Sequence, residues 1–208
     1  MTQELLQVLH PRAYEPKAKR DLRTTFYSII QGRANKAAAV EVLGEVVLNA
    51  FLGGKLQATR QLKQRHSILH REDFDVMEGA KIRYVQDFNG ILSNYNLGKE
   101  KLQKSYARLE VMGQVAVWQL YNLGKVSRFR EYDLEVRRSH HAQEFGHVEV
   151  ATAADCCEKC RAKRGVAFSL WGVLPDLPFH PGCRCELMYV PWKAAQTLTA
   201  GGIMVAVG

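Results

Sequence analysis

Five cysteines and one histidine near the C-terminal end are the residues whose types and spacing best suit chemistry. The cysteines are Cys156, Cys157, Cys160, Cys183 and Cys185. Cys157-x2-Cys160 is followed, after 19 residues, by His180-x2-Cys183. Two intervening residues allow both side chains of a turn to reach one ion, and thiolate and imidazole groups are the usual ligands of zinc. The spacing therefore predicts a zinc site.

The preferred ligand set joins the two turns of equal spacing. It consists of Cys157, Cys160, His180 and Cys183. In an alternative set Cys185 replaces His180, because in an extended chain Cys185 and Cys183 point to the same side. Four protein ligands leave no open position for water, so we expect a structural zinc and no enzyme activity. Two further alternatives stay open, namely buried thiols without metal and a redox pair in the first Cys-x2-Cys. Cys156 is expected to be a spectator.

A small α/β module must hold these ligands. Valine alternates with polar residues over residues 147–152, a pattern typical of a strand. A short β-prone segment at residues 166–171 and a returning strand at residues 186–192 flank a proline-rich turn region. Pro181 and Gly182 suit the second chelating turn, because proline presets φ and glycine tolerates a positive φ.

The part of the chain before this module has the apolar spacing of helices. We expect helices at residues 21–30, 40–51, 55–71, 71–91 and 99–123, after a loop from Pro11 to Pro16. Gly53 and Gly54 are interpreted as a helix stop. Gly113 is interpreted as a close helix contact or a bend, since glycine in a helix costs about 1 kcal/mol relative to alanine.

These patterns divide the 208 residues into unequal parts. We expect a helical arm or bundle at residues 1–130, the α/β module with its Cys/His zinc knuckle at residues 131–192, and an apolar, glycine-containing tail at residues 193–208. The fold class is therefore α+β. A module of about 60 residues buries little apolar surface, so a metal staple is expected in it.

The formal charge of +8 is concentrated in the N-terminal part of the chain. Residues 1–71 contain 12 Lys or Arg against 5 Asp or Glu, whereas residues 72–93 contain 2 against 5. The basic residues of segment 55–71 are Lys55, Arg60, Lys63, Arg65 and Arg71. A basic helix of this kind suits contact with nucleic acid phosphates or with an acidic partner, although a solvated helix face has the same composition.

Several classes of protein are not favoured by the sequence. No run of about 18 uncharged apolar residues is present, so no membrane-spanning helix is expected. The N-terminus lacks a basic start followed by an apolar run, which predicts an intracellular origin. Phosphate-binding loops, nucleophile elbows and dinucleotide fingerprints are also missing from the sequence.

The C-terminal motif resembles that of phage head morphogenesis proteins, the Mu F-like minor head proteins. The resemblance covers roughly residues 130 to 192. It consists of a strand, then Thr152, Asp155, Cys157-x2-Cys160, Gly165, Phe168 and the closing His180-Pro181-x-Cys183-Arg184-Cys185. The chain departs from the family in having Val166 after Gly165, where members often have Lys. It is also short for the family.

The resemblance implies a minor virion protein of a tailed bacteriophage, assembled in the host cytoplasm and located at the portal vertex or in the head interior. Its implied partners are the portal protein and the major capsid protein, with packaged double-stranded DNA nearby and no membrane. The competing hypothesis is a zinc-stapled nucleic-acid-binding protein or nuclease-like enzyme. A nuclease would need further His and Asp or Asn residues beside the knuckle, and the sequence offers few.

Overall fold

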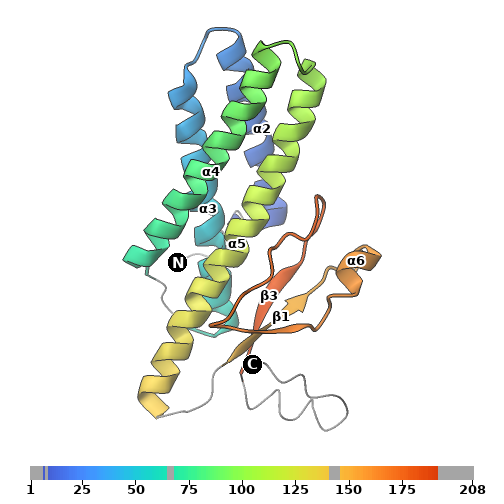
Figure 1. Ribbon diagram of the computed structural model, residues 1–208. Coiled ribbons are helices and arrows are strands. Elements are labelled where there is room, and N and C mark those ends of the chain that lie inside the picture. Colours follow the sequence, from blue (N-terminus) through green and yellow to red (C-terminus); the bar gives the residue numbers. More distant parts are fainter. Residues whose placement is uncertain (1–6, 8, 65–67, 141–145, 192–208) are drawn as a thin grey trace.

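Four long helices form a bundle, and a small sheet lies beside the lower half of the last helix (Figure 1). The computed structural model describes residues 7, 9–64, 68–140 and 146–191. The helices are α2 (Pro11–Ile30), α3 (Lys36–Gln61), α4 (Arg71–Asn96) and α5 (Leu102–His140). The C-terminal elements are β1 (His147–Ala151), the short helix α6 (Glu158–Arg161), β2 (Ala167–Ser169) and β3 (Glu186–Val190). The α+β class is confirmed, and the helical part is a bundle.

The first hydrophobic core fills the space between the four helices. Each helix buries one apolar stripe there, as helical periodicity requires. Phe26 of α2 reaches across the bundle, and its ring meets Phe88 and Tyr95 of α4 edge to face, with ring centres 5.9 and 5.7 Å apart. The expected loop from Pro11 to Pro16 is wrong, because α2 begins at Pro11, where proline's missing N–H removes no helical bond.

The expected helix stop at Gly53 and Gly54 is also wrong. α3 continues through both glycines to Gln61 because this part of α3 lies directly against its neighbours. A Cβ added to Gly54 would lie 1.9 Å from the carbonyl oxygen of Tyr121 in α5. Gly113 proves to be a close contact with α2, where an added Cβ would lie 3.0 Å from the Leu22 side chain.

The basic segment 55–71 is not one helix. α3 ends where Lys63 adopts a positive φ of 54°, and the N–H of Gln64 bonds the carbonyl of Thr59 at 2.9 Å. Helices commonly end in this way with a glycine in the left-handed conformation, and here Lys63 takes the place of the glycine. α4 begins anew at Arg71, with the His70 N–H donating to the Asp73 carboxylate at 2.9 Å. The described part of the segment is thus a helix end and a helix start, and residues 65–67 between them lie outside the described residues.

The sheet is antiparallel with the order β2-β1-β3, so β1 is the central strand. Val148 pairs with Phe168 on one side and with Tyr189 on the other. The three expected strands are confirmed, with β2 and β3 shorter than expected. α5 runs unbroken past residue 130, so the boundary expected there falls inside a helix. The expected tail at residues 193–208 lies outside the described residues.

The second hydrophobic core joins the sheet to the bundle. Ala58 of α3 and Val126 and Phe129 of α5 pack in it with Val148 and Leu187 of the sheet. The C-terminal module therefore shares its core with two helices of the bundle, and it does not bury its apolar residues alone.

α3 is long and apolar enough to span a membrane by length and composition alone. Within its most apolar stretch, 44% of the residues are buried in the bundle. The helix packs along α5 and against α2 and α4 in the structure. The absence of a membrane span thus stays a prediction from the sequence.

Candidate metal centre

Two chain segments bring the candidate ligands together. Cys157 precedes α6 and Cys160 lies inside it, so a single turn carries both thiols. The second turn closes with a hydrogen bond from the Cys183 N–H to the His180 carbonyl at 3.0 Å. Gly182 in this turn has a φ of 86°, which confirms the role expected for it.

The donor atoms form two groups of three that share one thiol. Cys157, Cys160 and His180 make one group, and Cys160, Cys183 and Cys185 make the other; within each group all donor atoms lie within 4.8 Å of one another. His180 Nε2 lies 3.0 Å from Cys157 Sγ and 3.1 Å from Cys160 Sγ. Such a cluster of thiol and imidazole groups could hold a metal ion, with Cys160 at its centre.

The distance between Cys160 and Cys183 fits tetrahedral coordination. Their sulfur atoms lie 3.6 Å apart. Two sulfur ligands of one tetrahedral zinc, each about 2.3 Å from it, lie about 3.8 Å apart. Cys183 and Cys185 both lie in the group around Cys160, so the structure brings both of these thiols to the candidate site.

Burial differs sharply across the site. Cys160, Cys183 and Cys185 are each 1% exposed and belong to the second hydrophobic core, whereas Cys157 is exposed. Cys156 lies in neither donor group and packs against the same core. The site thus consists of three buried thiols, and its edge at Cys157 is open to solvent.

The thiols have different proton affinities. Hydrogen bonds from the backbone and then the side chain of Cys160, followed by the nearby His180, lower the pKa of Cys157. Burial raises the pKa of Cys160 to about 12 and also raises that of Cys185. Because a metal-bound thiol is deprotonated, a metal at this site must displace protons from the buried thiols.

Two contacts outside the donor set hold the ligands in place. The Nδ1 atom of His180 lies 2.7 Å from the Pro181 carbonyl, and this contact turns Nε2 toward the cysteines. Asn122 of α5 donates to the Cys185 carbonyl at 3.2 Å and accepts from the Leu187 N–H at 2.9 Å. Sequence reasoning missed Asn122, because nothing in the pattern of α5 marks a residue 63 positions away from Cys185.

The structure corrects one residue of the predicted basic contact surface. Lys55 is 1% exposed, and its ammonium pairs with Asp73 at 2.6 Å and with Glu131. A cation held in this way cannot contact a partner, so the prediction for Lys55 is wrong. Arg60, Lys63 and Arg71 are exposed, and Arg65 lies outside the described residues.

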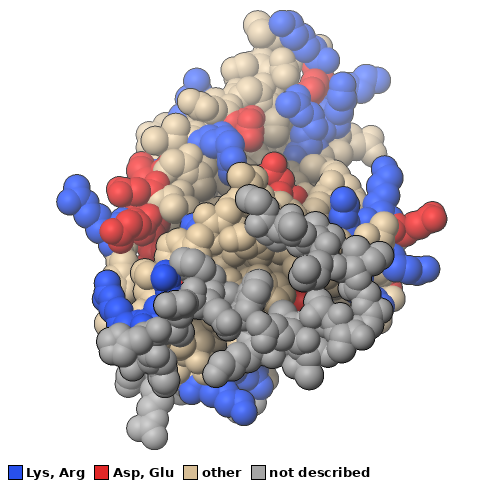
Figure 2. All heavy atoms as spheres, turned by 60° about the horizontal axis from the view of Figure 1, so that its bottom comes forward, with Lys and Arg blue, Asp and Glu red and all other residues tan. Residues whose placement is uncertain are grey.

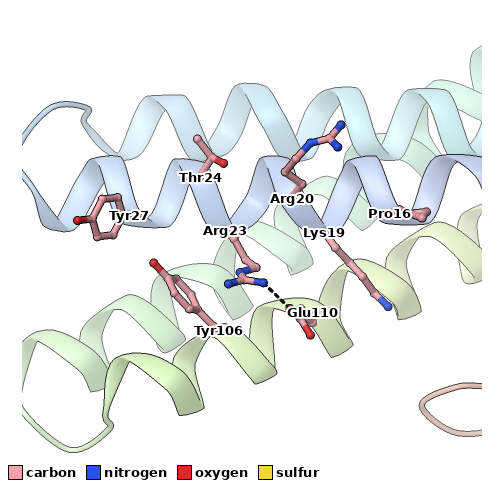
Figure 3. A pocket seen from close by; sticks show the side chains of 8 residues that line it. All are labelled: Pro16, Lys19, Arg20, Arg23, Thr24, Tyr27, Tyr106 and Glu110. Atoms are coloured by element: carbon pink, nitrogen blue, oxygen red, sulfur yellow. Dashed lines mark hydrogen bonds and ion pairs between the residues drawn. The ribbon is translucent and has the colours of Figure 1, made fainter.

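On the face of the molecule shown in Figure 2, basic side chains form separate groups. In Figure 2, Lys and Arg gather in patches around the edge of the face shown, not in one continuous stripe. One patch lines a groove of about 500 Å³ between α2 and α5. Figure 3 shows Arg23 and Tyr106 pointing toward each other across this groove, with Glu110 bonded to Arg23 at 2.9 Å.

Comparison of the chain with protein-family models, with curated proteins and with solved structures found no match. The resemblance of the C-terminal motif to head morphogenesis proteins thus stays a prediction.

Proposed function

We propose that this chain is a minor head protein of a tailed bacteriophage whose C-terminal module is stapled by a structural zinc ion. The single observation that carries the proposal is the convergence of four candidate ligand residues on the buried thiol of a fifth, Cys160. These residues are the Cys-x2-Cys and HPxCRC elements on which the resemblance to the family rests.

The preferred zinc ligands are Cys157, Cys160, His180 and Cys183, and the alternative set uses Cys185 in place of His180. Both sets connect the segment between β1 and β2 with the segment before β3. The two sets differ only in His180 and Cys185, so removing the His180 Nε2 atom or the Cys185 Sγ atom should show which set binds zinc. His180→Ala abolishes stoichiometric zinc if the preferred set binds, while Cys185→Ser leaves it intact. The reverse result supports the alternative set.

The zinc ion in this proposal has a structural role. Three of the thiols are buried in the core that α3 and α5 share with the sheet, so the ion stabilises the junction between module and bundle. Four protein ligands leave no position for a reactive water, which supports a protein that is not an enzyme. A zinc-stapled nucleic-acid-binding protein outside a virion is the second candidate, and the exposed Arg60, Lys63 and Arg71 favour it.

The proposed partners are the portal protein and the major capsid protein, with packaged DNA close by. The test is co-expression of the tagged chain with each of these two proteins from the same genome, followed by affinity purification. We expect the portal protein to co-purify with the wild-type chain, and the chain to be detected by mass spectrometry in purified heads. Heads that lack the chain, together with no capture of portal or capsid protein, would contradict the assignment.

A further inference from the structure

The outer face of the first chelating loop carries a group of basic side chains. Lys159, Arg161 and Lys163 are exposed, and we call these three residues the basic rim. Within the described part of the chain, no acidic side chain forms an ion pair with any of the three. Arg164 beside them donates to the Thr152 hydroxyl at 2.7 Å.

The loop that holds Cys160 inward turns the basic rim outward. Arg161 N–H bonds the Cys157 carbonyl and Lys163 N–H bonds the Cys160 carbonyl, each at 2.9 Å, so the loop is a compact helical turn. Gly165, with a φ of 71°, ends the turn and bonds β1 through the Val150 carbonyl at 2.9 Å. Figure 1 shows α6 on the side of the sheet away from the bundle.

The cations that line the groove between α2 and α5 are paired with neighbouring carboxylates. On α2, Lys17 pairs with Asp21 at 2.7 Å, and Arg23 pairs with Glu110 at 2.9 Å. The groove between α2 and α5 therefore presents charges that already have partners. The basic rim, in contrast, presents three cations without such partners on a single turn.

The charge of the metal centre does not account for the basic rim. Three thiolates and one histidine around Zn²⁺ have a formal charge of about −1. Arg184 also lies beside the site, where it pairs with Asp155 at 3.1 Å. The three unpaired cations of the rim thus carry more positive charge than is needed to neutralise the metal centre. They are available to an external polyanion.

We propose that the basic rim binds the phosphodiester backbone of double-stranded DNA, without reading sequence, when a metal ion holds the chelating loop. Ammonium and guanidinium groups displace counterions from phosphates, which gives affinity that depends on salt and not on sequence. This inference rests on the proposed metal staple, because the ligand Cys160 lies in the same turn, between Lys159 and Arg161.

The test uses the full-length protein with its metal and a fluorescent 20-base-pair DNA of random sequence. The rim variant is Lys159→Gln, Arg161→Gln, Lys163→Gln. The control is Lys99→Gln, Lys101→Gln, Lys104→Gln, which removes the same charge at the turn between α4 and α5 and in the first turn of α5, at the top of Figure 1. Binding is measured by anisotropy between 50 and 200 mM salt, with metal content measured on the same samples.

We expect the rim variant to retain its metal and to lose most of its DNA affinity. Three lost phosphate contacts reduce the salt slope by about 2.7, so wild-type affinity should fall about 40-fold more than rim-variant affinity over this fourfold salt range. The control variant should retain most of the wild-type salt slope.

Equal DNA binding by the wild type and the rim variant would overturn the inference, and so would an equal loss in both triple variants. Loss of metal from the rim variant would also overturn the inference, since the cations would then be needed to stabilise the thiolate ligands. Metal-free wild-type protein that still binds DNA through the rim would contradict the metal dependence. A wild-type chain without metal would instead contradict the proposed staple, which the metal assay reports separately.

Discussion

Gly54 of α3 and Gly124 of α5 face each other where the two helices cross. A Cβ on Gly54 would lie 1.9 Å from the Tyr121 carbonyl oxygen, and a Cβ on Gly124 would lie 2.0 Å from the Phe51 carbonyl oxygen. The two backbones are therefore in direct contact. This contact brings α3 and α5 close enough to build the second core against which the metal module packs.

Gly54→Ala should destabilise the protein by about 3 kcal/mol or more, because the added methyl group meets backbone that cannot move aside. Gly79→Ala on α4 is the matched control. No atom lies within 4 Å of its added Cβ, so it should stabilise the helix by about 0.5–1 kcal/mol. Urea denaturation measures both changes, and equal stability of the two variants would exclude a tight crossing.

Lys55→Met should cost about 3–5 kcal/mol in the free energy of unfolding. The substitution leaves the carboxylates of Asp73 and Glu131 without their buried cation. Arg60→Met on the same helix is the control, because Arg60 is exposed and its loss should change stability by at most about 0.5 kcal/mol. A Lys55 variant as stable as the Arg60 variant would show that the ion pairs of Lys55 with Asp73 and Glu131 contribute nothing to stability.

Regular periodicity located the middle of each long helix and of β1, and it placed the end of α2 at Ile30 and the start of α4 at Arg71. The start of α2 and the end of α3 were not predicted, and the apolar spacing of segment 55–71 wrongly indicated one helix. Gly53 and Gly54 misled the prediction because a glycine that ends a helix and a glycine at a helix crossing look the same in one sequence. Only the neighbouring helix, 70 positions away at Gly124, decides between them.

The candidate metal ligands could be predicted because their signal is local. The two turns carry their spacing in adjacent residues, and the fold had only to bring two short segments together. Lys55 was misassigned for the opposite reason. Its partners Asp73 and Glu131 lie 18 and 76 positions away, so composition alone placed it on the surface.

Metal affinity should rise with pH. Burial raises the pKa of Cys160 to about 12, so this thiol is protonated at neutral pH in the metal-free protein. Metal binding displaces the proton, and affinity should increase about tenfold per pH unit for each proton released. Competition with a chromophoric chelator at pH values of roughly 6.5, 7.5 and 8.5 measures the dependence. Affinity that is constant over this range would contradict ligation by the buried thiols.

The most direct test of the proposed staple is elemental analysis of the purified protein, combined with the melting temperature of two serine variants. We expect one zinc per chain in the wild type and in Cys156→Ser, whose sulfur lies outside both donor groups. Cys160→Ser removes the thiol that both groups share, so it should lose the zinc and melt at a clearly lower temperature. A wild type without zinc and a Cys160→Ser variant that melts with the wild type would contradict the staple.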